Sequence, residues 1–171
     1  LIESAGTLNG IVNCIGSVIL KPAHSTSDDE FRRTVETNLF SSFALVRSAG
    51  KLMREQGGSL ILFASAAAEV GIQNHEAIAA AKAGVIGLAR SAAATYASSN
   101  IRVNVISPGL VRTEMTRRIC SSHACSGKVR RAFRHCVAGR MDVEPDKRLD
   151  DGTGDRHGRR PRTRSCSTLV L

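Results

Sequence analysis

The 171-residue chain has no tryptophan, a single tyrosine and no uninterrupted apolar stretch of the roughly 18 residues that cross a membrane. The sequence therefore predicts a protein with no membrane partner. No basic-plus-apolar leader ending in a cleavage site is present, so a cytoplasmic location is the expectation. The first residue is Leu1 rather than methionine, which predicts a fragment.

The cysteines form no C-x-x-C pair. Four of the five lie in the last third of the chain, at Cys120, Cys125, Cys136 and Cys166. They predict free thiols in a reducing compartment rather than a disulfide framework. The histidines next to them are too irregularly spaced for a metal site, so no metal is expected.

The formal net charge of +9 is unevenly distributed. Residues 1–116 hold ten Lys/Arg against nine Asp/Glu, and residues 117–171 hold fourteen against six. The basic part has one aromatic residue, Phe133, whereas single-stranded nucleic-acid binders interleave basic and aromatic side chains. Nucleic acid is therefore not an expected partner, and the chain divides into a globular part and a basic, Gly/Arg-rich tail.

Three short apolar runs read as buried strands, at 8–15, 60–64 and 102–106. Each is followed by polar or turn-forming residues. The first ends at Gly16, the second at Ser65, and the third at the turn Pro108–Gly109. Helical segments separate the runs, an order that is typical of a parallel α/β sheet.

Two helices are expected, at 28–56 and 76–98. Ser27 and Glu30 form a capping box at the start of the first, which should end at Gly57–Gly58. Its apolar face is predicted from three- and four-residue spacing at Phe31, Val35, Leu39, Phe43, Val46 and Met53. The second helix is rich in alanine, which favours helix formation. It follows Ser65 in the sequence and carries Lys82 near its start.

These motifs together resemble the short-chain dehydrogenase/reductase family, and 3-oxoacyl-(acyl carrier protein) reductases in particular. The strings V-E-T-N-L-F around Asn38 and R-V-N-V-I-S-P-G, which ends at Gly109, carry the resemblance along with Ser65 and Lys82. It covers residues 1–119 and leaves 120–171 as a disordered tail. The implied fold is α/β: a partial Rossmann-like, doubly wound parallel sheet of three strands with flanking helices, plus the irregular basic tail.

The resemblance implies a nicotinamide-dependent oxidoreductase that takes NAD or NADP and a small keto or hydroxy substrate. The implied catalytic residues are Asn38, Ser65 and Lys82. The implied cofactor-binding residues are Asn13, Gly16, Lys82, Pro108, Gly109, Val111 and Thr113. From the residues alone, Asn13–Gly16 also reads as a strand-terminating turn, and Asn38 as a polar residue on a solvated helix face.

One departure from the family pattern concerns the chemistry. The family has a tyrosine four residues before the lysine, and this chain has Ile78 there. Isoleucine has no proton to give, so weak or absent turnover is expected. Tyr96 lies too far along the helix to substitute, and His75 and Glu76 read as surface residues. The alternative to an impaired enzyme is a non-catalytic binding protein or oligomer partner.

Small residues recur along the second helix, at Ala79, Ala80, Ala83, Gly84, Gly87 and Ala89. In the family this helix and the preceding one pair with their copies across a two-fold axis. A homodimer or homotetramer through helices 28–56 and 76–98 is therefore expected. A helix that packs only on its own sheet is the alternative.

The two ends of the chain depart from the family. No G-x-x-x-G-x-G loop is present, although such a loop holds the cofactor pyrophosphate. Reading degenerate codons for 122–161 one nucleotide downstream restores the family's C-terminal motifs in order. The sequence thus predicts a frameshift between about Thr116 and Ser122, which the coding DNA would reveal.

Overall fold

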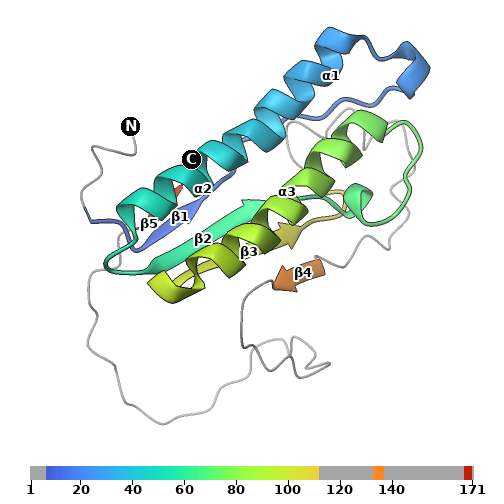
Figure 1. The fold of residues 1–171 in the computed structure, drawn as a ribbon. Coiled ribbons are helices and arrows are strands. Elements are labelled where there is room, and N and C mark those ends of the chain that lie inside the picture. Colours follow the sequence, from blue (N-terminus) through green and yellow to red (C-terminus); the bar gives the residue numbers. More distant parts are fainter. Residues whose placement is uncertain (1–6, 112–132, 137–167, 171) are drawn as a thin grey trace, which may run out of the picture.

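The structure is a computed structural model that describes residues 7–111, 133–136 and 168–170. Its centre is a parallel sheet of three strands, β1 (Gly10–Val12), β2 (Gly58–Phe63) and β3 (Ile101–Ser107). β2 lies in the middle, with Leu60 opposite Ile11 on one side and opposite Val103 on the other. The predicted three-stranded parallel α/β fold is confirmed. All three strands end at the same edge of the sheet (Figure 1).

Two short strands from the basic tail extend the sheet. β4 (Phe133–Cys136) runs antiparallel beside β3, and β5 (Thr168–Val170) runs parallel beside β1. The strand order is β4-β3-β2-β1-β5. Both edges of the central strands therefore have a backbone partner, which three strands alone would lack. The rest of the predicted tail and the predicted frameshift position lie outside the described residues, and the domain boundary at residue 119 stays a prediction.

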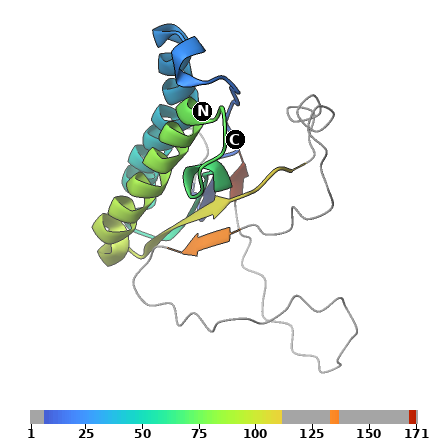
Figure 2. The same ribbon diagram turned by 90° about the vertical axis from the view of Figure 1, so that its right-hand side faces the viewer.

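The long helices all lie on one face of the sheet (Figures 1 and 2). Within the described residues, the other face has no helix over it. β3 shows the consequence: Val103 and Val105 are buried under the helices, whereas Arg102 is exposed on the opposite face and Asn104 is partly exposed there. This alternation is the period-2 pattern of a strand covered on one side.

The first helical segment begins as predicted. It consists of α1 (Asp28–Val35), a π-helical turn η2 (Glu36–Phe40) and α2 (Ser41–Leu52). The Glu30 backbone N–H donates to the Ser27 hydroxyl at 3.3 Å, and the Ser27 N–H donates to the Glu30 carboxylate at 2.9 Å. Both halves of the capping box are therefore present.

The predicted apolar face of this segment is partly wrong. Val46 and Met53 are buried, but Phe31 and Phe43 are 44% and 45% exposed. The π-turn adds a residue to the helix and shifts the phase of the side chains on either side of it. The face turned inward there is polar instead. It consists of Thr34, Asn38 and Ser42, which are four residues apart and all buried.

α2 ends at Leu52, four residues before the predicted end, and a turn leads to Gly57. Gly57 has φ +72°, the left-handed region that glycine adopts without a steric penalty. A Cβ there would also lie 2.9 Å from the Asn100 backbone oxygen. Gly57 is thus required both by the turn and by the close approach of the chain before β3.

α3 (Glu76–Tyr96) and the 3₁₀ turn η4 (Ala97–Ser99) cover β2 and β3. The helical stretch Glu76–Ser99 contains an 18-residue window with a mean hydropathy of 1.3 and is long enough to cross a membrane, although the sequence predicted no such segment. Half of its most apolar window is buried in the fold, where Val85 and Ala89 pack in the core. Core helices of globular proteins have this same composition.

The predicted small-residue stripe of α3 divides between two environments. Ala80, Ala83 and Gly87 are exposed, whereas Ala89 is fully buried against the sheet. Gly84 faces Leu39 of η2, so its small size lets the two helical segments approach each other. Ala89 therefore belongs to the core of the fold and not to an exposed interface.

Replacing Gly57 with alanine should destabilise the fold by about 1–2 kcal/mol, because alanine in the left-handed region is strained. Gly87 is the matched control. An added Cβ at this exposed α3 position meets nothing within 4 Å, so Gly87→Ala should stabilise by about 0.5–1 kcal/mol through helix propensity. Urea unfolding of both variants measures the difference, and equal effects would contradict the turn assignment.

Candidate active site

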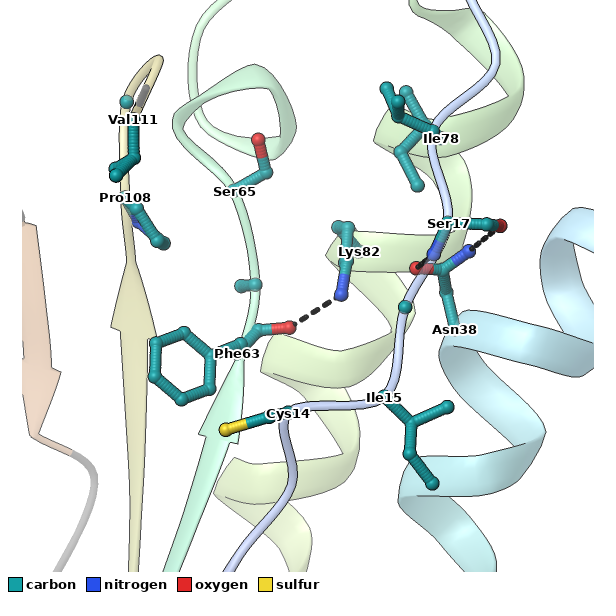
Figure 3. Close-up of a pocket in the computed structure, with 14 residues that line it drawn as sticks. Cys14, Ile15, Ser17, Asn38, Phe63, Ser65, Ile78, Lys82, Pro108 and Val111 are labelled. Carbon is teal, nitrogen blue, oxygen red and sulfur yellow. Dashed lines mark hydrogen bonds between the residues drawn. The ribbon is translucent and has the colours of Figure 1, made fainter. Parts of the chain in front are cut away.

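Two adjoining cavities lie at the carboxyl ends of β1, β2 and β3, where open α/β sheets bind ligands. The Lys82 cavity has a volume of about 330 Å³ and the Leu20 cavity about 440 Å³. Ser65, Ile78 and Gly109 line both of them. Figure 3 shows the residues around the Lys82 cavity, which come from all three strand ends, η2 and α3. Its lining consists of Cys14, Ile15, Gly16, Ser17, Val18, Asn38, Phe63, Ala64, Ser65, Ile78, Lys82, Pro108, Gly109 and Val111.

Lys82 reaches the cavity from α3 and is only 8% exposed. Its ammonium group donates to the backbone carbonyl of Phe63, the last residue of β2, at 2.8 Å. The described part of the chain contributes no carboxylate to the lining of this cavity. Burial without a counter-charge disfavours the ammonium form and lowers the pKa of Lys82 from 10.5 to about 8.

Asn38 is fully buried in the π-turn, so the reading of a polar residue on a solvated face is wrong. Its side-chain amide donates to the Thr34 carbonyl at 2.9 Å and to the Ser17 hydroxyl at 3.0 Å. Its side-chain oxygen accepts from the Ser17 backbone N–H at 3.2 Å. In the π-turn the Thr34 carbonyl thus accepts a hydrogen bond from the Asn38 side chain. The bonds between Asn38 and Ser17 hold the loop after β1 in place.

Asn13 lies behind the cavity wall rather than in it. It is 1% exposed, donates to the Ser42 hydroxyl at 3.0 Å, and accepts from the Ile15 backbone N–H at 3.0 Å. Ser42 in turn donates to the Asn38 carbonyl at 2.8 Å. Asn13 therefore shapes the loop that carries Gly16, as the predicted turn after β1 requires, and its role in cofactor binding stays a prediction.

Ser65 follows β2 and caps the 3₁₀ turn η3 (Ala66–Ala68), where its hydroxyl accepts from the Ala67 N–H at 3.2 Å. The Ala66 N–H donates to the Pro108 carbonyl at 2.9 Å, which joins this turn to the Pro-Gly turn after β3. Pro108, Gly109 and Val111 line the Lys82 cavity, as Figure 3 shows for Pro108 and Val111. Thr113 lies outside the described residues.

Ile78 is 4% exposed and separates the two cavities, one helical turn before Lys82. Tyr96 packs against Gly50 of α2, at the far end of α3, and so supplies no phenol to the site. His75 lines the Leu20 cavity, where its Nδ1 is 2.7 Å from the Gln73 carbonyl oxygen. The reading of His75 as a surface residue is therefore incomplete, whereas Glu76 is exposed as expected.

Sequence reasoning missed Cys14 and Ser17 on the loop after β1, and the backbone carbonyl of Phe63. The position of the loop at a strand's carboxyl end was an available signal for the first two. A backbone carbonyl carries no residue-specific signal, so its role as the partner of Lys82 required coordinates. Within the described residues, no group of three or more His, Cys, Asp or Glu could hold a metal ion.

A family model described as enoyl-(acyl carrier protein) reductase matches residues 1–143. The chain belongs to the short-chain dehydrogenase/reductase family. The trans-4-hydroxycyclohexanecarboxylate dehydrogenase of Sinomonas cyclohexanicum is 41% identical over 115 residues, which are 67% of this chain and 44% of that protein. The 3-oxoacyl-(acyl carrier protein) reductase of Mus musculus is 34% identical over 122 residues, or 69% of this chain and 50% of that protein.

Solved structures of short-chain dehydrogenases share the fold. A 4-hydroxyisoleucine dehydrogenase mutant complexed with NADH and succinate has a TM-score of 0.65 and 32% identity, covering 69% of this chain and 49% of that one. The chain thus spans about half the length of the relatives it matches. The family match extends past residue 119, where the recognisable sequence motifs end.

The lowered pKa of Lys82 makes the stability of the fold depend on pH. Between pH 8 and 10.5 the unfolded chain binds the lysine proton and the folded chain has released it. The free energy of unfolding should therefore rise with pH across this window, by about 1 kcal/mol per pH unit. Urea unfolding at pH 8 and pH 10 measures this rise. Lys82→Met should abolish it, and a rise that survives in this variant would contradict the assignment to Lys82.

Proposed function

We propose that the chain carries the reaction-centre half of an NAD- or NADP-dependent oxidoreductase acting on small keto or hydroxy compounds, impaired by Ile78. The carrying observation is that Asn38, Ser65, Lys82 and the Pro108–Gly109 turn line one cavity. They come from distant parts of the sequence. Their convergence at the carboxyl ends of parallel strands supports a shared chemical role.

The residues present fit the nicotinamide end of a cofactor. Gly16 lets the loop pass close to the site, since a Cβ there would lie 3.2 Å from the Asn38 side-chain oxygen and 3.6 Å from the Lys82 nitrogen. Gly16, Lys82 and the Pro108–Gly109 turn would hold the nicotinamide and its ribose, and Thr113 is proposed for the carboxamide. A bound nicotinamide would supply or accept the hydride. The described residues include no glycine-rich loop for the pyrophosphate.

The Leu20 cavity is the proposed substrate site. Its apolar lining, which includes Val18, Leu20 and Ile72, suits the hydrocarbon part of a keto or hydroxy compound. Ser65 borders both cavities, so its hydroxyl can donate to the substrate oxygen from their boundary. The relatives named above are dehydrogenases and a reductase of hydroxy or oxo compounds, which supports this substrate class.

Ile78 occupies the place from which a proton would reach the substrate oxygen. Its hydrocarbon side chain neither donates nor accepts a proton, and Lys82 is turned toward the Phe63 carbonyl instead. General acid or base groups contribute about 10²–10⁴ in rate, so their loss leaves weak turnover or none. We propose that the predicted domain, residues 1–119, acts in the cytoplasm, where reduced thiols and nicotinamide cofactors occur together.

Replacing Ile78 with tyrosine should raise the rate of NADH or NADPH oxidation with a ketone substrate by about 10²-fold or more. The new phenol would stand one turn from the Lys82 amine, which favours the phenolate. A spectrophotometric assay with a panel of small ketones measures the change. The control Ile78→Phe provides the ring without the hydroxyl and should leave the rate unchanged. Equal activity in the parent chain and Ile78→Tyr would contradict the proposal that Ile78 impairs the reaction.

A second candidate function, an oligomer partner, rests on an exposed aromatic surface. Phe31, Phe40 and Phe43 are 44%, 56% and 45% exposed on α1, η2 and α2. The rings of Phe40 and Phe43 lie 6.4 Å apart, and the Arg47 guanidinium lies 5.7 Å from the Phe43 ring centre. Aromatic and arginine side chains are enriched where proteins associate. We propose a homodimer or homotetramer through this surface and the exposed small residues of α3.

Replacing Phe40 with glutamate should weaken self-association at least about tenfold, because it places a charge in an apolar contact. Sedimentation equilibrium over a concentration series measures the dissociation constant. The matched control is Val70→Glu, since Val70 is 59% exposed on the segment between η3 and α3. It should leave the association unchanged. A monomeric parent chain, or an equal loss in both variants, would contradict the interface.

A further inference from the structure

The Lys82 cavity contains an amine in an environment that is unusual for lysine. The side chain is 8% exposed, and its nitrogen donates to the Phe63 carbonyl. Among the described residues that line the cavity there is no carboxylate, and Cys14 is the only titratable group besides Lys82. The two ion pairs of the described part of the chain, Lys21–Glu30 and Asp29–Arg32, lie elsewhere, on and before α1.

The nitrogen is also at the wall of an open space. Figure 3 shows it between the end of β2 and the loop carrying Ser17, with Ile78 one turn above it. The groups that surround this space are mostly hydrocarbon, such as Ile15, Phe63 and Ile78. An apolar molecule with a polar end could place that end at the nitrogen while its hydrocarbon part contacts these side chains.

We propose that Lys82 is a covalent carbonyl-binding site, in which its Nζ forms a Schiff base with a small apolar aldehyde. The nitrogen lone pair forms a bond to the carbonyl carbon, and the carbonyl electron pair moves to oxygen. A proton passes from nitrogen to that oxygen through water to give a carbinolamine. The hydroxyl then takes a proton from solvent and leaves as water while the nitrogen lone pair forms the C=N bond, and the remaining proton on nitrogen is lost to solvent. The products are an imine and one water molecule, with no change of oxidation state.

The protonation state of Lys82 supports this reaction, since only a neutral amine is nucleophilic. With its pKa near 8, roughly one Lys82 side chain in ten is neutral at pH 7. An ordinary lysine of pKa about 10.4 is neutral in roughly one molecule in 2,500. None of the described groups that face Lys82 carries a negative charge that would raise its pKa again. β2 contributes a backbone carbonyl, η2 contributes the neutral side chain of Asn38, and the loop after β1 contributes the thiol of Cys14.

Ile78 makes the site possible. A phenol at this position would hold the neighbouring amine in its charged form and would occupy the space above it. The isoleucine side chain instead keeps the cavity wall apolar and has no negative charge that would stabilise the ammonium form of Lys82. The residue change that removes the proposed proton donor therefore exposes the amine as a nucleophile, and this consequence does not require a nicotinamide.

Reductive trapping of the full chain with butanal and cyanoborohydride at pH 7 tests the proposal. Cyanoborohydride converts the imine into a stable secondary amine, and peptide mass spectrometry locates the butyl group. Lys51, an exposed lysine on α2, is the reference amine within the same protein. Lys82 should be modified at least about tenfold faster than Lys51, after allowance for restricted access to a buried site. No nicotinamide is added, so the result is independent of the proposed oxidoreductase activity.

Five comparisons keep the test specific. Lys82→Arg should remove the fast modification, whereas Lys51→Arg should leave it unchanged. Ile78→Tyr should slow modification at Lys82 to the rate of Lys51. Cys14→Ser should have no effect, because a hemithioacetal is not reduced by cyanoborohydride. Unfolding in urea should equalise the two lysines, which shows that the fold creates the difference. Equal rates at Lys82 and Lys51 in the folded chain, or another lysine side chain that reacts as fast as Lys82, would overturn the proposal.

Discussion

The hydrogen bond from the Lys82 nitrogen to the Phe63 carbonyl connects the two parts of the structure on which the site depends. It joins the second turn of α3 to the end of the central strand, at the wall of the Lys82 cavity, where the lysine side chain is 8% exposed. A buried ammonium with one neutral partner is less stable than the same ammonium in water. This loss of stability lowers the pKa of Lys82. The packing of Val85, Ala89 and other core residues of α3 on the sheet offsets this cost and holds Lys82 at the cavity wall.

The second constraint is the polar line along the first helical segment. Thr34, Asn38 and Ser42 are buried where a helix would ordinarily present apolar residues, and each of them is hydrogen-bonded. A buried polar group without a partner would cost about 1–3 kcal/mol, so this line specifies one arrangement of η2 against the loop after β1. The same bonds place Gly16 beside Lys82. Fold specificity and site geometry therefore share the same residues.

The sequence predicted the three parallel strands, both long helices and the capping box at Ser27, because these depend on local patterns. Resemblance to a family also pointed to Asn38, Ser65, Lys82 and Gly109 as site residues, and the structure brings these four to one cavity. The π-turn was not predictable from spacing, and it reversed the burial of Phe31 and Phe43. The partner of Lys82 was not predictable either, since backbone carbonyls look alike in sequence. β4 and β5 pair over long separations that no local pattern encodes.

The central claim is that Lys82 is held out of water at the carboxyl ends of the strands. A ¹³C NMR titration of the chain labelled at the lysine side chains measures this directly, with Lys82→Arg to assign the resonance. The account predicts that Lys82 titrates with a midpoint near pH 8 in the folded chain. A midpoint at the ordinary value of 10.5 would place the amine in solvent and contradict the account.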